Sequence, residues 1–248
     1  MDFKGKVALV TGGGRGIGRA TALALARGGA DILVNYLQNH NAAKVVVEAI
    51  QALGRKAAAV QGNVGNQSDV AAMFEQLDKV FGKIDILVNN AGTGKLVSLE
   101  EMTLDFWNTI LQVDLTGPFL CTQAAAARMI PRKYGRIVNI SSIGAVRGIP
   151  LDPSYTAAKA GLLGFTKSMA RYLGKHNITV NALCPGPIDT ELSRNLPKEM
   201  REHTVKSSAL GRMGTPDDVA DAILFFASDY SRHVTGQMIL VDGGIVMP

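Results

Sequence analysis

Seven short apolar segments recur from one end of the chain to the other, with helix-length segments between them. They do not alternate with polar residues, so each is predicted to be a strand buried on both faces, as in a parallel sheet covered by helices. Residues 41–53 illustrate the intervening segments, because their apolar side chains recur at spacings of three and four. The predicted strands are residues 7–10, 32–34, 57–60, 84–88, 137–140, 178–180 and 238–241.

This alternation predicts the α/β class, with one doubly wound, Rossmann-type sheet of seven parallel strands and helices on both faces. The chain of 248 residues suffices for one such domain, residues 1–248, and is too short for two. Ser68, Thr103 and Thr215 are predicted to be helix N-caps. The longest irregular segment, residues 185–210, follows the sixth strand at the sheet edge where ligands bind, which predicts a substrate loop at about residues 187–210.

The composition argues against several classes of protein. The net charge is +5, but the basic residues are scattered, which indicates a mild preference for anionic ligands rather than a nucleic-acid surface. Cys121, Cys184 and the four histidines show no metal-ligand spacing, and the cysteines are interpreted as packing residues, so neither a metal nor a disulfide is expected. No apolar run is long enough to cross a membrane, and the polar residues 1–6 do not resemble a signal peptide, so a cytoplasmic location is expected.

Residues 11–18, Thr-Gly-Gly-Gly-Arg-Gly-Ile-Gly, join the first predicted strand to the first helix. Glycines at such a corner permit a tight turn and let backbone N–H groups approach a pyrophosphate at the helix N-terminus. Gly12, Gly16 and Gly18 give the spacing Gly-x-x-x-Gly-x-Gly, with Arg15 and Ile17 between them. This spacing differs from the Gly-x-Gly-x-x-Gly fingerprint, but its place in the first βαβ unit predicts a dinucleotide site.

The end of the second strand bears on the choice of cofactor. It reads Asn35-Tyr36, without the acid that would hold the ribose 2′-OH of NAD(H). Arg15 is expected to reach a 2′-phosphate, although no second arginine follows Tyr36. NADP(H) is therefore the favoured cofactor, with NAD(H) as the alternative.

Three further residues predict acid–base chemistry. Tyr155 and Lys159 are four residues apart and therefore share one face of a helix, and Ser142 follows the strand over residues 136–141. A lysine ammonium close to a phenol favours the phenolate, so such a phenol can exchange a proton with a carbonyl oxygen or an alcohol. A serine hydroxyl opposite the phenol can hold the same oxygen.

Together these features resemble the short-chain dehydrogenase/reductase family over essentially the whole chain. The matching segments are Thr11-Gly12-x-x-x-Gly16-x-Gly18, Asn89-Asn90-Ala91-Gly92, Ser142, Tyr155-x-x-x-Lys159 and Pro185-Gly186-x-x-x-Thr190. The resemblance implies an NAD(P)-dependent oxidoreductase acting on CH–OH groups. In it, Tyr155 is the acid/base, Ser142 orients the carbonyl, and Lys159 holds the nicotinamide ribose.

The resemblance also implies the residues that contact the cofactor. Asn90 would lie against the dinucleotide, and Ile188 and Thr190 would meet its nicotinamide end. The full implied set is Gly12, Arg15, Gly16, Ile17, Gly18, Tyr36, Asn63, Val64, Asn90, Ala91, Gly92, Tyr155, Lys159, Pro185, Gly186, Ile188 and Thr190.

Two positions depart from the family pattern. Asp114 stands where the family usually has a catalytic asparagine that supports a proton-relay water, and an ionised carboxylate near Lys159 would weaken the effect of the lysine on Tyr155. We therefore predict that Asp114→Asn retains or improves activity and moves the pH profile to lower pH; the alternative is a purely structural acid. Asn63-Val64 replaces the usual Asp-Val, and the asparagine amide still offers a donor and an acceptor to adenine.

Residues 150–159 and 233–237 resemble those of 3-oxoacyl-[acyl-carrier-protein] reductases, which implies reduction of a 3-oxoacyl thioester in fatty acid biosynthesis. Lys133 and Arg171 are then expected to meet an acidic carrier at the mouth of the site. Sugar dehydrogenases, general alcohol dehydrogenases and carbonyl reductases are alternatives, and a non-catalytic dinucleotide-binding protein is a remote one. The family also implies a homotetramer that pairs through helices at residues 105–129 and 155–176 and through the C-terminal strand.

Overall fold

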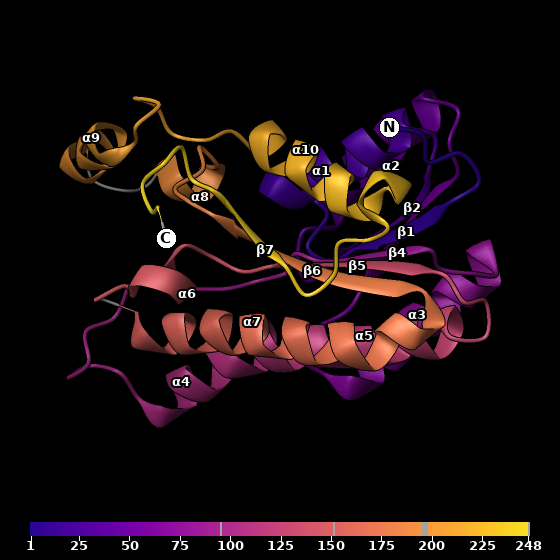
Figure 1. The fold of residues 1–248 in the computed structure, drawn as a ribbon, viewed down its shortest axis with the longest axis horizontal. Coiled ribbons are helices and arrows are strands. Elements are labelled where there is room, and N and C mark those ends of the chain that lie inside the picture. Colours follow the sequence, from indigo (N-terminus) through magenta and orange to yellow (C-terminus); the bar gives the residue numbers. More distant parts are fainter. Residues whose placement is uncertain (95, 151, 195–197, 248) are drawn as a thin grey trace.

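The computed structural model describes residues 1–94, 96–150, 152–194 and 198–247. In this part of the chain, seven strands form one sheet in the order β3-β2-β1-β4-β5-β6-β7, and every neighbouring pair is parallel (Figure 1). The predicted seven-stranded parallel sheet is thus confirmed. The strands are β1 (Val7–Val10), β2 (Asp31–Tyr36), β3 (Ala57–Gln61), β4 (Ile86–Asn89), β5 (Gly135–Ile140), β6 (Ile178–Pro185) and β7 (Met238–Val241).

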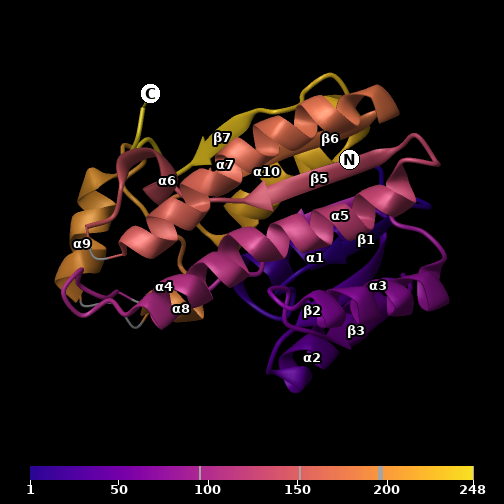
Figure 2. The same cartoon turned by 90° about the horizontal axis from the view of Figure 1, so that it is seen from below.

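Helices cover both faces of the sheet, as predicted (Figures 1 and 2). One face carries α1 (Gly16–Arg27), α2 (His40–Ala52) and α10 (Pro216–Ala227), and the other carries α3 (Gln67–Phe81), α4 (Leu104–Leu111), α5 (Gly117–Met129) and α7 (Pro153–Leu173). A π-helical turn, η1 (Gln112–Thr116), joins α4 to α5. The remaining helices are α6 (Gly144–Arg147), α8 (Glu191–Arg194), α9 (Lys198–Ser207) and the 3₁₀ turns η2 (Gly174–His176) and η3 (Asp229–Ser231).

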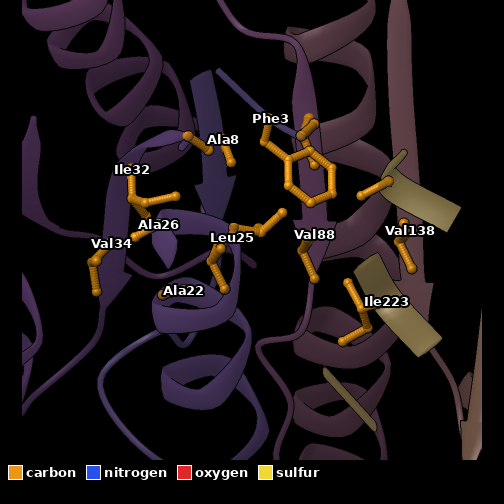
Figure 3. Close-up of a cluster of buried hydrophobic side chains, with 14 of the residues drawn as sticks. Phe3, Ala8, Ala22, Leu25, Ala26, Ile32, Val34, Val88, Val138 and Ile223 are labelled. Carbon is orange, nitrogen blue, oxygen red and sulfur yellow. The ribbon is translucent and has the colours of Figure 1, made fainter. Parts of the chain in front are cut away.

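The core lies in two layers because each strand buries both of its faces. Along β1, Ala8 and Val10 belong to the apolar cluster beneath α1 and α10, whereas Leu9 belongs to the cluster beneath α3 and α5. Figure 3 shows part of the first cluster, in which Leu25 and Ile223 face the strands. This two-sided burial explains why the strands read as unbroken apolar runs.

The strand order creates a crevice at the carboxyl ends of β1 and β4. The chain runs outward from β1 to β3, then crosses to β4 on the other side of β1. The loops that follow β1 and β4 therefore leave in opposite directions, which is the topological switch point where ligands bind in open α/β sheets. The functional side chains described below gather at this edge.

Some element boundaries differ from those expected. The helix α2 begins at His40, one residue earlier than predicted, because Asn39 caps it by accepting the Ala42 N–H. Thr103 and Thr215 cap α4 and α10 as predicted, but α3 is capped by Asn66, whose side chain accepts the N–H groups of Ser68 and Asp69. The prediction of Ser68 as a cap was wrong because α3 begins at Gln67, before Ser68, and Asn66 accepts the N–H groups of its first turn.

The segment 185–210 is not irregular throughout, contrary to the prediction. It contains α8 and α9 among its described residues. Good helix formers (lysine, glutamate, methionine and arginine) fill the start of α9. The sequence did not predict α9 because this segment has too few apolar residues to show a helical periodicity.

The strand β6 is longer than predicted and includes Cys184, which was expected after the strand. Asn181 interrupts the apolar pattern there, although it is buried and its side chain bonds to the carbonyl of Val234 and the N–H of Gln237. Both cysteines are free and buried, and burial raises the pKa of the Cys121 thiol to about 12. Their interpretation as packing residues agrees with this burial.

Candidate active site

The glycine turn after β1 forms the floor of the crevice. Asn35, at the end of β2, accepts the Gly12 N–H with its side-chain oxygen at 3.2 Å and the Gly13 N–H with its backbone carbonyl at 2.8 Å. Gly12 and Gly16 have φ values of +61° and +52°, in the left-handed region that favours glycine. Among the described residues no side chain caps α1 and its first turn holds no acid, so its first N–H groups suit an anion such as a pyrophosphate.

Thr11 and Asn90 hold this turn against the end of β4. The Thr11 hydroxyl oxygen accepts the N–H groups of Asn90 and Ala91, both at 2.9 Å. The Asn90 amide donates to the carbonyls of Thr11 at 2.9 Å and Gly12 at 3.2 Å. A Cβ at Gly18 would lie 2.6 Å from the Asn90 amide nitrogen, so this glycine permits the close approach of helix and loop.

A second group of predicted cofactor residues lies at the carboxyl ends of β2 and β3. The Tyr36 hydroxyl lies 2.8 Å from Nδ1 of His40, at the start of α2. Asn63 accepts the Gly65 N–H with its side-chain oxygen at 3.0 Å. Val64 is buried and packs against Gly117, where a Cβ would lie 2.8 Å from it. Arg15 is exposed and directly precedes α1.

Tyr155 lies in the first turn of α7, which Asp152 caps. The Asp152 carboxylate accepts the Tyr155 N–H at 3.1 Å and the Ser154 hydroxyl at 3.0 Å, and Pro153 opens the helix. A Cβ at Gly94, in the loop after β4, would lie 3.5 Å from the phenol ring. The capped helix start therefore fixes the half-buried ring beside the β4 loop.

Lys159, one turn further along α7, is tied to the end of β5. Its ammonium donates to the Ile140 carbonyl at 3.0 Å, and its own backbone carbonyl accepts the Ser141 hydroxyl at 2.9 Å. The ammonium nitrogen lies 5.5 Å from the centre of the Tyr155 ring. These contacts set α7 against β5, so that Tyr155 and Lys159 lie at the same sheet edge as Ser142.

Asp114 lies in the π-helical turn η1 and forms a buried ion pair with Lys159, with 3.1 Å between Oδ1 and Nζ. Burial raises the pKa of Asp114, although the Lys159 ammonium and the Thr93 N–H oppose the rise. Burial lowers the pKa of Lys159, but its interactions, foremost with the Asp114 carboxylate, outweigh burial and the pKa is raised. The carboxylate and the ammonium are therefore each other's main electrostatic partner.

Ser142 and the residues after β6 complete the edge. The Ser142 oxygen accepts the Gly144 N–H at 3.0 Å, so its own hydrogen can be donated elsewhere. Pro185 ends β6, and Gly186 approaches β7 so closely that a Cβ would lie 2.8 Å from the Asp242 Cα. Ile188 is buried, and the Thr190 methyl lies 3.6 Å from the place of a Cβ on Gly16.

The structure brings the glycine turn, Asn90, Asp114, Ser142, Tyr155 and Lys159 to one edge of the sheet. Thr11, Asn35, Ser141 and Asp152 also shape this edge, but the sequence analysis assigned them no role of their own. For Thr11, Asn35 and Ser141, the signal available in the sequence was a polar residue at the end of an otherwise apolar strand. The signal for Asp152 was its place before Pro153 at the start of a helix.

Within one chain, Lys133 and Arg171 lie away from this edge. Lys133 precedes β5 whereas Ser142 follows it, and a strand of six residues spans roughly 20 Å. Arg171 lies in the last turn of α7 and Tyr155 in the first, which separates them by roughly 24 Å. Closeness in sequence to β5 and α7 did not say which end of each element the residues occupy, and their contact with an acidic carrier stays a prediction.

In the part of the chain that the structure describes, no cluster of histidine, cysteine and acidic side chains could hold a metal ion. No described helix is long and apolar enough to span a membrane. His40, His176, His203 and His233 lie in different elements or loops.

Comparisons with known proteins agree with this arrangement. A family model described as enoyl-(acyl carrier protein) reductase matches residues 12–246. The chain is 45% identical over 243 residues to a 3-oxoacyl-[acyl-carrier-protein] reductase of Synechocystis sp., covering 98% of this chain and 97% of the relative. It is 40% identical over 247 residues to a 3-oxoacyl-[acyl-carrier-protein] reductase of Thermotoga maritima, covering all of both chains.

Solved structures show the same fold. A crystal structure from Agrobacterium tumefaciens, described as that of "a putative gluconate dehydrogenase", has a TM-score of 0.95 and 35% identity and covers 99% of this chain and 98% of its own. The family match, the full-length relatives and the Ser142, Tyr155 and Lys159 geometry agree with the resemblance seen in the sequence. The chain belongs to the short-chain dehydrogenase/reductase family of nicotinamide-dependent oxidoreductases.

Proposed function

We propose that the protein is an NADPH-dependent reductase that converts the keto group of a 3-oxoacyl thioester to a secondary alcohol. The observation that carries this proposal is the placement of Tyr155 and Lys159 on one face of α7. Lys159 is hydrogen-bonded to Ile140 and Ser141 at the end of β5, directly before Ser142. The names of the full-length relatives at 40% and 45% identity supply the substrate class. An acyl-carrier-bound substrate, a homotetramer and a cytoplasmic location form part of the same proposal.

The residues at the sheet edge fit a dinucleotide. The uncapped start of α1 after Gly12 and Gly16 would hold the pyrophosphate, with Ile17 and Gly18 in the first helical turn. Tyr36, Asn63, Val64 and Arg15 would surround the adenosine. The nicotinamide end would meet the residues after β4 and β6, which are Asn90, Ala91, Gly92, Pro185, Gly186, Ile188 and Thr190.

The protein's own residues perform the acid–base part of the reaction. When bound, the reduced nicotinamide supplies the hydride that reaches the carbonyl carbon. Tyr155 donates its phenolic proton to the carbonyl oxygen, so that a C–H bond and an O–H bond form as the C=O π bond breaks. Ser142, whose oxygen already accepts the Gly144 N–H, donates its hydrogen to the same oxygen. The Lys159 ammonium stabilises the phenolate that remains.

A second function deserves a test because the fold matches a structure described as a gluconate dehydrogenase at 35% identity. In that case the same Ser142, Tyr155 and Lys159 would oxidise a secondary alcohol, with Tyr155 accepting the proton. Residues 187–210, of which 195–197 lie outside the described part, would form the substrate loop in either case. The side chains of this loop would select between an acyl thioester and a polyol.

The first experiment follows oxidation of NADPH and NADH by absorbance, with acetoacetyl thioester, small ketones and sugars as substrates. We expect turnover of the thioester with NADPH and at least a hundredfold loss in Tyr155→Phe, since acid–base catalysis contributes about 10²–10⁴-fold. Binding of NADPH to Tyr155→Phe, measured by calorimetry, serves as the control for folding. Turnover of sugars alone would favour the second function, and cofactor binding without turnover of any substrate would favour a non-catalytic binding protein.

A further inference from the structure

The ion pair between Asp114 and Lys159 is enclosed by the protein. The two side chains are 0% and 5% exposed, and the nitrogen–oxygen distance is 3.1 Å. Lys159 also donates to the Ile140 carbonyl at 3.0 Å, which leaves one of its three N–H bonds for the crevice. Such a pair holds the ammonium in place far more firmly than a neutral side chain would.

Two local features of the backbone make room for the carboxylate. The π-helical turn η1 inserts Asp114 between α4 and α5, and π turns of this kind recur at functional sites. Gly92 lies against Asp114, and a Cβ on it would come 2.6 Å from Oδ1. The next residue, Thr93, donates its N–H to both carboxylate oxygens at 3.2 and 3.3 Å. The loop after β4 is therefore shaped to receive a carboxylate at this position.

The charge of the pair matters for Tyr155. The Lys159 ammonium lies 5.5 Å from the centre of the phenol ring and favours the phenolate form, whereas a carboxylate beside the ammonium opposes that effect. The other titratable groups that act on the pair are Asp152, which acts on Asp114, and Tyr155 and Cys184, which act on Lys159. Within the pair, Asp114 therefore compensates the positive charge of the Lys159 ammonium.

We propose that Asp114 is a positioning residue that binds Lys159 as a nearly neutral internal pair and thereby keeps Tyr155 protonated, as a proton donor for reduction, to higher pH. This inference rests on the proposed role of Tyr155 as the acid but not on the identity of the substrate. It also gives the two directions of the reaction different pH dependences. Reduction needs the phenol and proceeds over a wide pH range, whereas oxidation of an alcohol needs the phenolate and becomes efficient only at more alkaline pH.

The test compares wild type with Asp114→Asn and with Asp105→Asn, an exposed acid on α4 that serves as the matched control. Phenolate formation by Tyr155 is followed without cofactor, as the ultraviolet difference between each protein and the same protein carrying Tyr155→Phe. We expect the phenolate to appear at a pH about one unit lower in Asp114→Asn. The alkaline limb of the reduction rate should move by a similar amount, while Asp105→Asn should match wild type.

Asp114→Glu restores the charge and should return both curves toward those of wild type. Unchanged phenolate formation in Asp114→Asn would overturn the inference. Should Asp114→Asn fail to fold, carbon NMR of aspartate-labelled wild type decides the matter, because a protonated Asp114 carboxyl at neutral pH would also overturn it. The phenolate measurement needs neither substrate nor cofactor, so it remains readable even if no thioester is turned over.

Discussion

A single hydroxyl group joins the two loops of the cofactor crevice. Thr11 is 1% exposed, and its oxygen accepts two N–H groups from the β4 loop while its hydrogen is donated to the Val88 carbonyl at 3.3 Å. The threonine therefore uses all of its hydrogen-bonding capacity inside the protein. The glycines of the turn supply the shape of the crevice, and Thr11 with Asn90 fixes that shape.

The proposed preference for NADPH rests on the exposed Arg15. We predict that Arg15→Ala weakens NADPH binding by about tenfold, the equivalent of one charged hydrogen bond, and leaves NADH binding unchanged. Calorimetric titration with both dinucleotides measures the effect. Arg27→Ala, at the far end of α1, is the control. An equal loss for both cofactors would contradict a role at the 2′-phosphate, and tighter binding of NADH by wild type would reverse the cofactor assignment.

At the scale of elements, one buried aspartate, Asp85, links the starts of β1, β4 and β5 at the edge opposite the active site. The Asp85 carboxylate accepts the Val7 N–H of β1 at 2.9 Å and pairs with Arg132 at 2.6 Å and Lys83 at 3.0 Å. Its backbone carbonyl accepts the Arg136 N–H of β5 at 2.9 Å. Burial would raise the pKa of Asp85, but Arg132, the Val7 N–H and Lys83 outweigh it and hold the pKa below its ordinary value.

This depressed pKa predicts a pH-dependent stability. Asp85 adds stability above the unfolded-state pKa of about 3.9, and that stability is lost as the pH falls through the lower folded-state pKa. Asp85→Asn should therefore reduce the free energy of unfolding by about 3 kcal/mol at neutral pH, with the difference narrowing below about pH 4. Urea unfolding at several pH values measures it, with the exposed Asp221→Asn as the control. A difference independent of pH would show that the charge is not responsible.

At the scale of the whole molecule, apolar side chains remain exposed on α5 and α7, the helices through which we expect assembly. Phe119 of α5 is 43% exposed and stacks edge-on against Phe165 of α7, with ring centres 6.3 Å apart. Tyr172, on the last turn of α7, is also exposed. Aromatic side chains such as these are enriched in protein–protein interfaces.

We therefore predict that the protein forms a homotetramer of four 26.3 kDa chains and that Phe119→Asp yields smaller species. Light scattering after gel filtration gives the mass, and far-ultraviolet circular dichroism shows that the variant remains folded. Val45→Asp, an exposed apolar position on α2, serves as the control. A tetramer that survives Phe119→Asp would place the interface elsewhere, and a monomeric wild type would remove the assembly from the proposal.

The sequence by itself determined the class of fold and the main chemistry. Unbroken apolar strands and helical segments in strict alternation admit few arrangements other than a parallel sheet with two helical layers. The glycine turn, Ser142, Tyr155 and Lys159 were likewise predictable, because their chemistry depends on local spacing or on position at a strand end. These signals lie within short segments, so they can be recognised without knowledge of contacts between distant segments.

Only the tertiary structure decided the features that depend on contacts between distant segments. The burial of Asp114 against Lys159 needs a π turn and the Gly92 loop to meet α7, and neither can be inferred from residue spacing. Likewise, the positions of Lys133 and Arg171 at the far ends of β5 and α7 follow from strand direction rather than from residue type. Electrostatic effects depend on distance and burial, and both are set when the whole chain packs.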